Sequence, residues 1–318
     1  MTDLQDRLRG IAVGAVVGDA LGMPLEFKPP RPEFNFETEM VKGPLPAGTF
    51  TDDTEMALAL AESLFISSPL DVQDLAGRFT GWYQSRPSDI GIHTAAVLKL
   101  IAGGVPAGKA AKQVQKQDPD SAGNGGLMRT WPIAIVRHKQ PGLLTSETAL
   151  QTELTHSHPD CVNGSLFLNS VLYQILQESQ RPAAEIVRNA IQKAKDQVAL
   201  DEDFLLTINL APMRIRKDLK NSGWVRDTIE SALWAVMNTL SFEEALVRVV
   251  NLGNDADTAG AVTGAIAGAL YGLSGIPSRW KDAIHGEYPL RSGKLWFVKD
   301  FIELADKLAV LSDNDKNM

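Results

Sequence analysis

Apolar residues recur three and four positions apart along most of the chain, the spacing that places them on one face of an α-helix. The pattern is clear in residues 4–16, 72–83 and 166–176, and Pro159 and Pro277 stand where helix starts would place them. Strand-like alternation of polar and apolar residues is scarce. The pattern therefore predicts roughly a dozen helices and an all-α fold.

No linker rich in glycine and serine divides the helical segments, and a chain of 318 residues can bury one large core. We therefore expect a single domain over residues 1–318, with residues 312–318 as a frayed tail. The main long connection runs from Phe27 to Gly48 and is rich in proline and glycine. Long loops in compact domains are usually functional, which directs attention to Glu26 at its start.

The most apolar stretch of the chain runs from Ala259 to Leu273. At about 15 residues it is too short to span a bilayer. Glycine occupies every fourth position from Gly260 to Gly272. Because glycine disfavours a helix, such a stripe implies that another backbone packs very close to it. We expect a central buried helix here.

Composition excludes several classes of partner. The chain has 31 basic and 39 acidic residues, a net charge of -8, and no lysine or arginine cluster long enough to follow a phosphate backbone. Nucleic acid is therefore an unexpected partner, and we expect no membrane partner. Cys161 is the single cysteine, which fits a reducing compartment, and the start of the sequence lacks the regions of a signal peptide. These features favour a cytoplasmic protein.

Two clusters of oxygen ligands are the strongest chemical signal in the sequence. They are Thr51-Asp52-Asp53-Thr54 and Asp255-Ala256-Asp257-Thr258, and each opens a stretch of small apolar residues. Carboxylates and hydroxyls suit Mg²⁺, Mn²⁺ or Ca²⁺ better than Zn²⁺ or copper. Four aspartates brought together would repel one another unless cations lay between them, and four are enough to hold two ions. The clusters together predict one site for two divalent cations.

Each cluster also has a simpler explanation. Asp52 followed by Glu55 fits a capping box, and Asp255 or Asp257 could cap the next helix. A cap needs one oxygen, however, so capping leaves the paired acids unexplained. The second cluster also resembles the DxD nucleophile loop of haloacid-dehalogenase-like phosphatases, which follows a buried strand. The helical spacing of residues 242–251 disfavours that alternative.

Three further segments place polar groups in unusual surroundings. Residues 18–26 look like a helix exit that ends in Glu26, which is either an ordinary turn residue or a general acid or base at the mouth of a metal site. Residues 123–129 form a glycine-rich turn before a helix, which is often structural but can offer N–H groups to an anion. Residues 155–160 contain two histidines, more often hydrogen-bonded scaffold than ligands.

In their order and wording these motifs resemble the ADP-ribosylglycohydrolase family, which includes the dinitrogenase-reductase-activating glycohydrolases. The resemblance covers nearly the whole chain. It rests on residues 18–26, Thr51-Asp52-Asp53-Thr54, residues 123–129, Thr155-His156 and Asp255-Ala256-Asp257-Thr258. Five motifs in the same order are far more specific than any one of them.

The resemblance implies an all-helical domain with two Mg²⁺ or Mn²⁺ ions at the bottom of an ADP-ribose cleft. It makes Glu26 the acid whose loop closes over the substrate, and it places Asp89 near the scissile bond. The implied metal ligands are Thr51, Asp52, Asp53, Asp255, Asp257 and Thr258. The implied substrate-binding residues are Gly91, Gly123, Asn124, Gly125, Gly126, Leu127, Met128, Arg129 and His156.

The activity that the resemblance implies is a metal-dependent hydrolase that cleaves the glycosidic bond of ADP-ribosylated proteins or small molecules. ADP-ribosyl-arginine is the preferred substrate, because residues 89–91 resemble those of arginine-directed bacterial members. ADP-ribosyl-serine and O-acetyl-ADP-ribose are alternatives. A further alternative is a non-catalytic ADP-ribose-binding or structural member, since eye-lens crystallins have been drawn from this family. The intact ligand set disfavours that alternative.

Overall fold

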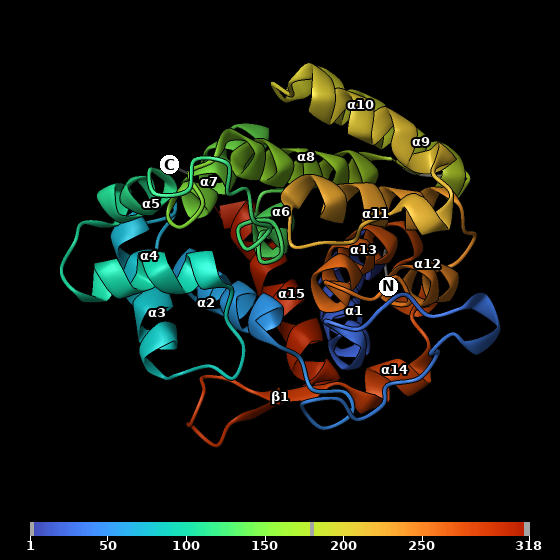
Figure 1. Ribbon diagram of the computed structural model, residues 1–318, viewed down its shortest axis with the longest axis horizontal. Helices are drawn as coiled ribbons and strands as arrows, with labels where there is room; N and C mark the ends of the chain where they lie inside the picture. The colour runs from blue at the N-terminus through green and yellow to red at the C-terminus, as the bar shows by residue number, and fades with distance from the viewer. Residues whose placement is uncertain (1–2, 179–180, 315–318) are drawn as a thin grey trace.

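The structure, a computed structural model, describes residues 3–178 and 181–314. Helices dominate this part of the chain, which confirms the predicted all-α fold (Figure 1). The α-helices are α1 (Asp3–Gly22), α2 (Asp52–Ile66), α3 (Val72–Gln84), α4 (Ile92–Ala102), α5 (Ala107–Gln115), α6 (Trp131–Val136), α7 (Pro141–Glu153), α8 (Pro159–Gln177), α9 (Ala183–Gln197), α10 (Glu202–Leu210), α11 (Val225–Met237), α12 (Phe242–Val250), α13 (Ala256–Tyr271), α14 (Ser278–Ala283) and α15 (Val298–Asn314). The 3₁₀ helices are η1 (Met23–Leu25), η2 (Glu33–Asn35), η3 (Ala211–Met213), η4 (Arg216–Asp218) and η5 (Leu273–Gly275), and the strands are β1 (His285–Glu287) and β2 (Leu295–Phe297).

Helices α1 and α13 form an antiparallel pair at the centre of the molecule (Figure 1). Gly14 of α1 faces Gly264 of α13, and Gly18 faces Gly260. A Cβ atom added to Gly264 would lie 2.0 Å from the carbonyl oxygen of Gly14, so neither backbone has room for a side chain there. The expected close approach of a second backbone is confirmed. Gly272 differs from the other glycines, because it ends α13 with a φ of 71°.

The apolar character of α1 reflects this central position. The segment Asp3–Leu25 is long and apolar enough to cross a membrane by length and composition, whereas Ala259 to Leu273 is too short. Within the protein, 94% of the most apolar window of that segment is buried. Core helices pass the same test, and the contacts of α1 with α13 and α15 identify it as one of them.

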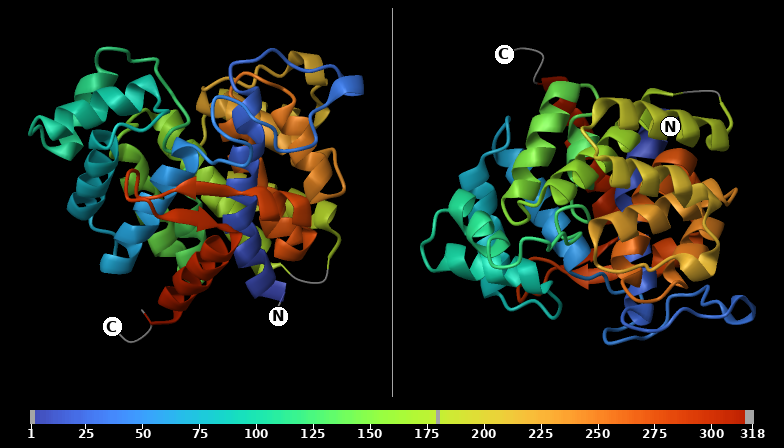
Figure 2. Two further views of the ribbon diagram at one scale, coloured as in Figure 1. Left: turned by 90° about the horizontal axis from the view of Figure 1, so that it is seen from below. Right: turned by 45° about the horizontal axis from the view of Figure 1, so that its top comes forward.

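The remaining helices surround the central pair. Helices α8, α11, α12 and α15 pack against it, while α2 connects it to α3, which in turn packs against α4. Figure 2 (left) shows α3 to α5, in blue-green, on one side of the molecule, and the loop after η1, in blue, beside α11 and α12 on the other. A small antiparallel hairpin pairs His285 with Phe297, and Thr49 bridges to His285. The sequence did not predict this hairpin, because strands of three residues are too short for an alternating pattern.

The end of the described chain differs from the expected frayed tail. Helix α15 continues to Asn314, and Ser312 is fully buried. The apolar residues of this helix, which include Phe301 and Leu308, belong to the main hydrophobic core. The prediction of a tail from residue 312 is therefore wrong at its start, while residues 315–318 lie outside the described residues.

Candidate active site

A cleft of about 790 Å³ opens where the exit of α1 meets the start of α13. The antiparallel pairing of these helices explains the meeting, because it brings Glu26, just after η1, to the first turn of α13. Acidic groups, the glycine-rich segment and a histidine pair line it together. The predicted site residues among its lining are Glu26, Asp52, Asp89, Gly91, Gly123, Asn124, Gly125, Met128, His156, Asp255, Asp257 and Thr258.

Carboxylates from four separate segments converge in the cleft and directly behind it. Oxygen atoms of Glu26, Asp89 and Asp257 lie within 4.8 Å of one another. Behind them, Thr258 Oγ1 donates a hydrogen bond of 3.2 Å to Asp53 Oδ2. The two predicted clusters are thus in contact, although 205 residues separate these two positions in the sequence.

One buried oxygen in this group lacks a partner. Asp53 Oδ1 is inaccessible to solvent and accepts no hydrogen bond from the described residues. A buried carboxylate oxygen normally has a donor, because leaving it unpaired costs about 1 to 3 kcal/mol or more. The side-chain atoms that could bind a metal ion here are hard oxygens, which are the ligand type that Mg²⁺ and Mn²⁺ prefer. The residues present therefore fit divalent cations, with Asp53 Oδ1 free to act as a ligand.

The acids of the first cluster are not used as helix caps. Thr51 is the N-cap residue of α2 and makes no side-chain cap hydrogen bond, so the predicted Asp52–Glu55 capping box is absent. Glu55 instead accepts a hydrogen bond of 2.7 Å from Trp82 Nε1. Asp255 likewise begins α13 without a side-chain cap bond to it. The capping alternative is therefore wrong for the first cluster and for Asp255, whereas Asp257 Oδ1 accepts a hydrogen bond of 2.9 Å from the backbone nitrogen of Thr258 in the first turn of α13.

Asp19, near the end of α1, caps α2 from outside that helix. Its carboxylate accepts hydrogen bonds from the backbone nitrogen and hydroxyl of both Thr51 and Thr54, at 2.6 to 3.2 Å. Burial raises the pKa of Asp19 to about 6, although these four groups oppose the rise. Asp19 therefore fixes the first turn of α2 and leaves Asp52 available to the cleft and Asp53 to the acidic group directly behind it.

Crowding and burial disfavour the charged form of the cluster. Burial, and then the charges of neighbouring acids, raise the pKa values of Asp52, Asp53 and Asp257 well above the ordinary range. The pKa of Glu26 rises to about 8, first through burial and then through Asp89. Clusters of carboxyls with raised pKa values are typical of catalytic and metal sites. The protein stores unfavourable electrostatic energy here that divalent cations would relieve.

The loop that carries Glu26 is joined to the loop before Asp255. The backbone nitrogen of Phe27 donates to the carbonyl of Asn254 at 2.7 Å, and the nitrogen of Asn254 donates to the carbonyl of Lys28 at 2.8 Å. Farther along, the side chain of Asn251 bonds the backbone of Glu37 in both directions. These bonds connect the position of Glu26 directly to the second acidic cluster.

The glycine-rich segment holds one of the acids rather than only lining the cleft. Asn124 Nδ2 donates to Asp255 Oδ2 at 2.6 Å and to Thr228 Oγ1 at 2.9 Å. The backbone nitrogen of Asn124 donates to the carbonyl of Gly223, so this N–H group is not open to a ligand. Asn124 therefore orients a predicted metal ligand, a role that the anion-cradle interpretation did not include.

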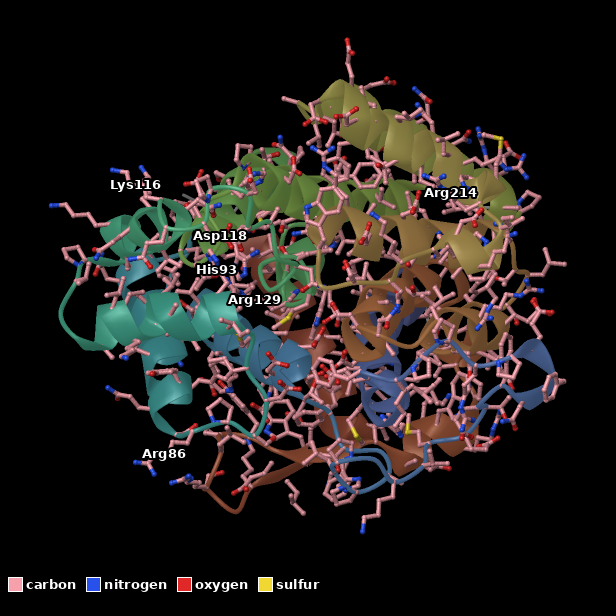
Figure 3. The ribbon with its side chains drawn as sticks, in the orientation of Figure 1. Arg86, His93, Lys116, Asp118, Arg129 and Arg214 are labelled. Atoms are coloured by element: carbon pink, nitrogen blue, oxygen red, sulfur yellow. The ribbon has the colours of Figure 1, made fainter. Side chains whose placement is uncertain are left out.

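Five predicted residues lie beneath the cleft surface. They are Thr51, Asp53, Gly126, Leu127 and Arg129, none of which is among the lining residues. Arg129 is fully buried, with its guanidinium 4.4 Å from the ring centroid of Phe79. Figure 3 places it toward the middle of the molecule, while Arg86 and Lys116 extend at the outer edge. Arg129 therefore supports the cleft from below and does not reach a ligand directly.

The structure also adds residues to the cleft that the sequence did not single out. They are Phe27, Ile90, Ile92, His93, Thr94, Ser222, Gly223 and Asn254. His93 stacks on His156, with ring centroids 4.8 Å apart. Ile92, His93 and Thr94 follow directly after Asp89-Ile90-Gly91, and adjacency to that motif was the available signal. Ser222 and Gly223 are not adjacent to any of the recognised motifs, so no signal in the sequence pointed to them.

Comparison with known proteins supports the family resemblance over nearly the whole chain. The family model described as ADP-ribosylglycohydrolase matches residues 1–317. The chain belongs to the ADP-ribosylglycohydrolase family. A solved structure titled "ADP-ribosylglycohydrolase-related protein complex" superimposes with a TM-score of 0.78 at 30% identity, covering 98% of this chain and 100% of that one.

Two curated relatives in this family carry informative names. The ADP-ribosylarginine hydrolase Tri1 of Serratia proteamaculans is 34% identical over 290 residues, which cover 88% of this chain and 75% of that protein. The ADP-ribosyl-[dinitrogen reductase] glycohydrolase of Rhodospirillum rubrum is 32% identical over 283 residues, covering 87% of this chain and 90% of that protein. Family and relatives together support ADP-ribosyl hydrolase activity for this ADP-ribosylglycohydrolase.

Proposed function

We propose that this chain acts as a single ADP-ribosylglycohydrolase domain that cleaves the glycosidic bond between ADP-ribose and an arginine side chain of a modified protein, with two Mg²⁺ or Mn²⁺ ions as cofactors. The observation that carries the proposal is the convergence of Glu26, Asp89 and Asp257 in a cleft of about 790 Å³. A cleft of this volume suits a ligand of nucleotide size. The buried single cysteine, Cys161, is consistent with the cytoplasmic location that we propose.

The protein's own residues would divide the work along the cleft. Met128 and the glycine-rich segment, with His156 behind it, would hold the nucleotide portion, and Asp89 and Glu26 would lie beside the bond that breaks. Hydrolysis at the anomeric carbon needs an attacking water, and a leaving guanidine that gains a proton. Glu26 is placed to hold or move that proton, because its carboxyl shares one space with those of Asp89 and Asp257.

The proposed ligands of the two cations are Thr51, Asp52, Asp53, Asp255, Asp257 and Thr258. Divalent cations at such a site can orient ribose hydroxyls and lower the pKa of a bound water. Asn124 holds Asp255, and Asp19 holds the first turn of α2, so both ligand clusters are oriented before any ion binds. Such orientation is what metal sites require of their supporting residues.

The preference for arginine rests on relatives and on charge. The Tri1 relatives of Serratia proteamaculans and Pseudomonas putida are named ADP-ribosylarginine hydrolases and are 34% and 32% identical to this chain. A guanidinium at the cleft mouth would meet Glu26 and Asp89, whereas an ester or serine ether would bring no positive charge to them. The acidic lining therefore favours arginine over ADP-ribosyl-serine and O-acetyl-ADP-ribose.

The proposal is tested by metal analysis of the purified protein, followed by release assays on ADP-ribosyl-arginine, ADP-ribosyl-serine and O-acetyl-ADP-ribose with and without EDTA. We expect release from ADP-ribosyl-arginine that EDTA abolishes and Mg²⁺ or Mn²⁺ restores. ADP-ribose should also raise the melting temperature only when a divalent cation is present, since stabilisation follows occupancy of the folded state. ADP-ribose binding without release from any substrate would instead indicate a non-catalytic binding protein.

A further inference from the structure

Thr155 connects a buried cation to two stacked imidazole rings that line the cleft. Its hydroxyl oxygen lies 2.7 Å from Arg129 Nη2 and 2.8 Å from His156 Nδ1. Its backbone carbonyl lies 3.0 Å from His93 Nε2. Both histidines of the stacked pair are therefore held by this one residue, which Arg129 also contacts.

The proton positions at this junction follow from what each group can do. A guanidinium only donates, so Arg129 occupies a lone pair of the Thr155 hydroxyl. The hydroxyl hydrogen then needs an acceptor, and His156 Nδ1 is the neighbour at hydrogen-bond distance. If Nδ1 carried a proton instead, two donors would point at one oxygen and the buried hydroxyl hydrogen would be unpaired. That arrangement costs about 1 to 3 kcal/mol, so Nδ1 accepts and Nε2 carries the proton.

The second nitrogen of His156 lies against the glycine-rich segment that lines the cleft. A Cβ atom added to Gly125 would lie 3.0 Å from His156 Nε2, and one added to Gly123 would lie 3.5 Å from it. His156 is itself a lining residue. The absence of side chains on these glycines is what leaves Nε2 a path to a ligand that lies over the segment.

We infer that Arg129 and Thr155 are positioning residues that hold His156 as the Nε2–H tautomer, so that it donates one neutral hydrogen bond to an oxygen of the ADP-ribosyl group lying over Gly123 and Gly125. The identity of the ligand rests on the proposed function, whereas the tautomer rests on the geometry alone. Arg129 thus contributes to recognition through Thr155 and not by contact with phosphate.

The charge state of His156 agrees with this geometry. Burial, followed by the charges of Arg129 and His93, lowers the pKa of His156 well below its usual range. A neutral ring has one donor and one acceptor nitrogen, so the hydroxyl of Thr155 decides which is which. His93 is held in a matching way, since a carbonyl can only accept and its Nε2 must donate.

The first experiment reads the tautomer directly. The protein is labelled with ¹⁵N-histidine, held in Mg²⁺ without nucleotide, and examined by long-range ¹⁵N–¹H correlation at neutral pH, with His156→Phe to assign the ring. We expect a protonated Nε2 and an unprotonated Nδ1 that accepts a hydrogen bond. A protonated Nδ1, or a charged ring, would overturn the inference. Because no substrate is present, this result is independent of whether the protein hydrolyses any ADP-ribosyl bond.

The second experiment separates positioning from mere structural support. In Thr155→Val, which keeps the shape but loses the hydroxyl, the Nδ1 resonance should move to the position of an imidazole nitrogen without a hydrogen bond. ADP-ribose should bind about 5-fold more weakly, the size expected for one oriented hydrogen bond. Thr155→Ser, which keeps a hydroxyl, should return the Nδ1 resonance to its wild-type position. It should also return the Kd for ADP-ribose to within about twofold of wild type. Adding Thr155→Val to His156→Phe should have no further effect on binding. An unchanged Kd in Thr155→Val, with only the melting temperature lowered, would show a structural role and overturn the inference.

Discussion

Asp19 Oδ2 lies 2.6 Å from the hydroxyl oxygen of Thr54 and 3.2 Å from its backbone nitrogen. Through this pair the last turn of α1 caps the first turn of α2. Capping from another helix is a tertiary interaction, and it releases the local acids from that task. Asp52 and Asp53 can therefore serve the cleft although they occupy the first turn of α2, where capping residues usually lie.

Removing one carboxylate of the cluster should abolish activity but raise the stability of the metal-free protein. We expect Asp257→Asn to abolish metal-dependent hydrolysis, because divalent cations need the lost oxygen charge. The metal-free variant should melt at a higher temperature than the metal-free wild type, because the carboxyl that it loses has a charged form disfavoured by burial and by neighbouring acids. Release assays and thermal unfolding in EDTA measure the two effects. Asp203→Asn, at an exposed acid of α10, is the control that should change neither.

The metal-free protein should lose stability as the pH rises. Asp52, Asp53 and Asp257 have raised pKa values, so the folded protein binds more protons than the unfolded chain above pH 4. The free energy of unfolding then falls with increasing pH. We expect a lower melting temperature at pH 8 than at pH 5.5 in EDTA, and a smaller difference with Mg²⁺. A melting temperature in EDTA that rises over this interval would contradict the raised pKa values.

Glu26 should matter more for turnover than for binding. Glu26→Gln should lower kcat by about 10² to 10⁴ if its carboxyl moves a proton or holds the attacking water. The affinity for ADP-ribose should stay within about an order of magnitude of wild type, since this product has no leaving group to protonate. Steady-state release assays and calorimetry measure the two quantities. The control is Glu33→Gln, at an exposed position on the same loop. Wild-type turnover in Glu26→Gln would show that Glu26 does not move the proton or hold the water, and would leave that role to Asp89.

The glycine contact between the central helices should tolerate no added methyl group. We expect Gly264→Ala to destabilise the protein by about 3 kcal/mol or more, because overpacking against the backbone of Gly14 forces the two helices apart. The matched control is Gly77→Ala in α3, where an added Cβ meets nothing within 4 Å. That change should stabilise the protein by about 0.5 to 1 kcal/mol. Chemical denaturation of both variants gives the comparison.

Sequence patterns predicted the helices and the two acidic clusters because both signals are local. Helical spacing and the stripe from Gly260 to Gly268 follow directly from residue order, and the resemblance named residues that do line one cleft. The capping box at the start of α2 is the feature that the local pattern predicted wrongly. Asp52 and Glu55 fit the local rule, but the partner of the α2 N-terminus is Asp19, which precedes a long loop. A local sequence pattern cannot predict an interaction between residues on the two sides of such a loop.

The same limit explains the other differences. Arg129 belongs to a motif that reads as ligand-binding, yet its side chain turns inward onto Phe79 and Thr155. Its direction depends on α3 and α7 packing beneath the segment, which a motif does not encode. Ser312 looked like part of a tail because polar residues follow it, but the apolar face of α15 keeps it buried.

The pairing of α1 with α13 also sets an order of events during synthesis. The glycine face of α1 leaves the ribosome first, but its partner face is complete only after Tyr271 has been added. Until then a long apolar helix has no backbone to pack against, and Glu26 has no Asp257 beside it. The cleft is thus assembled from distant parts of the chain at one late step, and every shortened chain that stops before α13 should expose α1 to other chains or to chaperones.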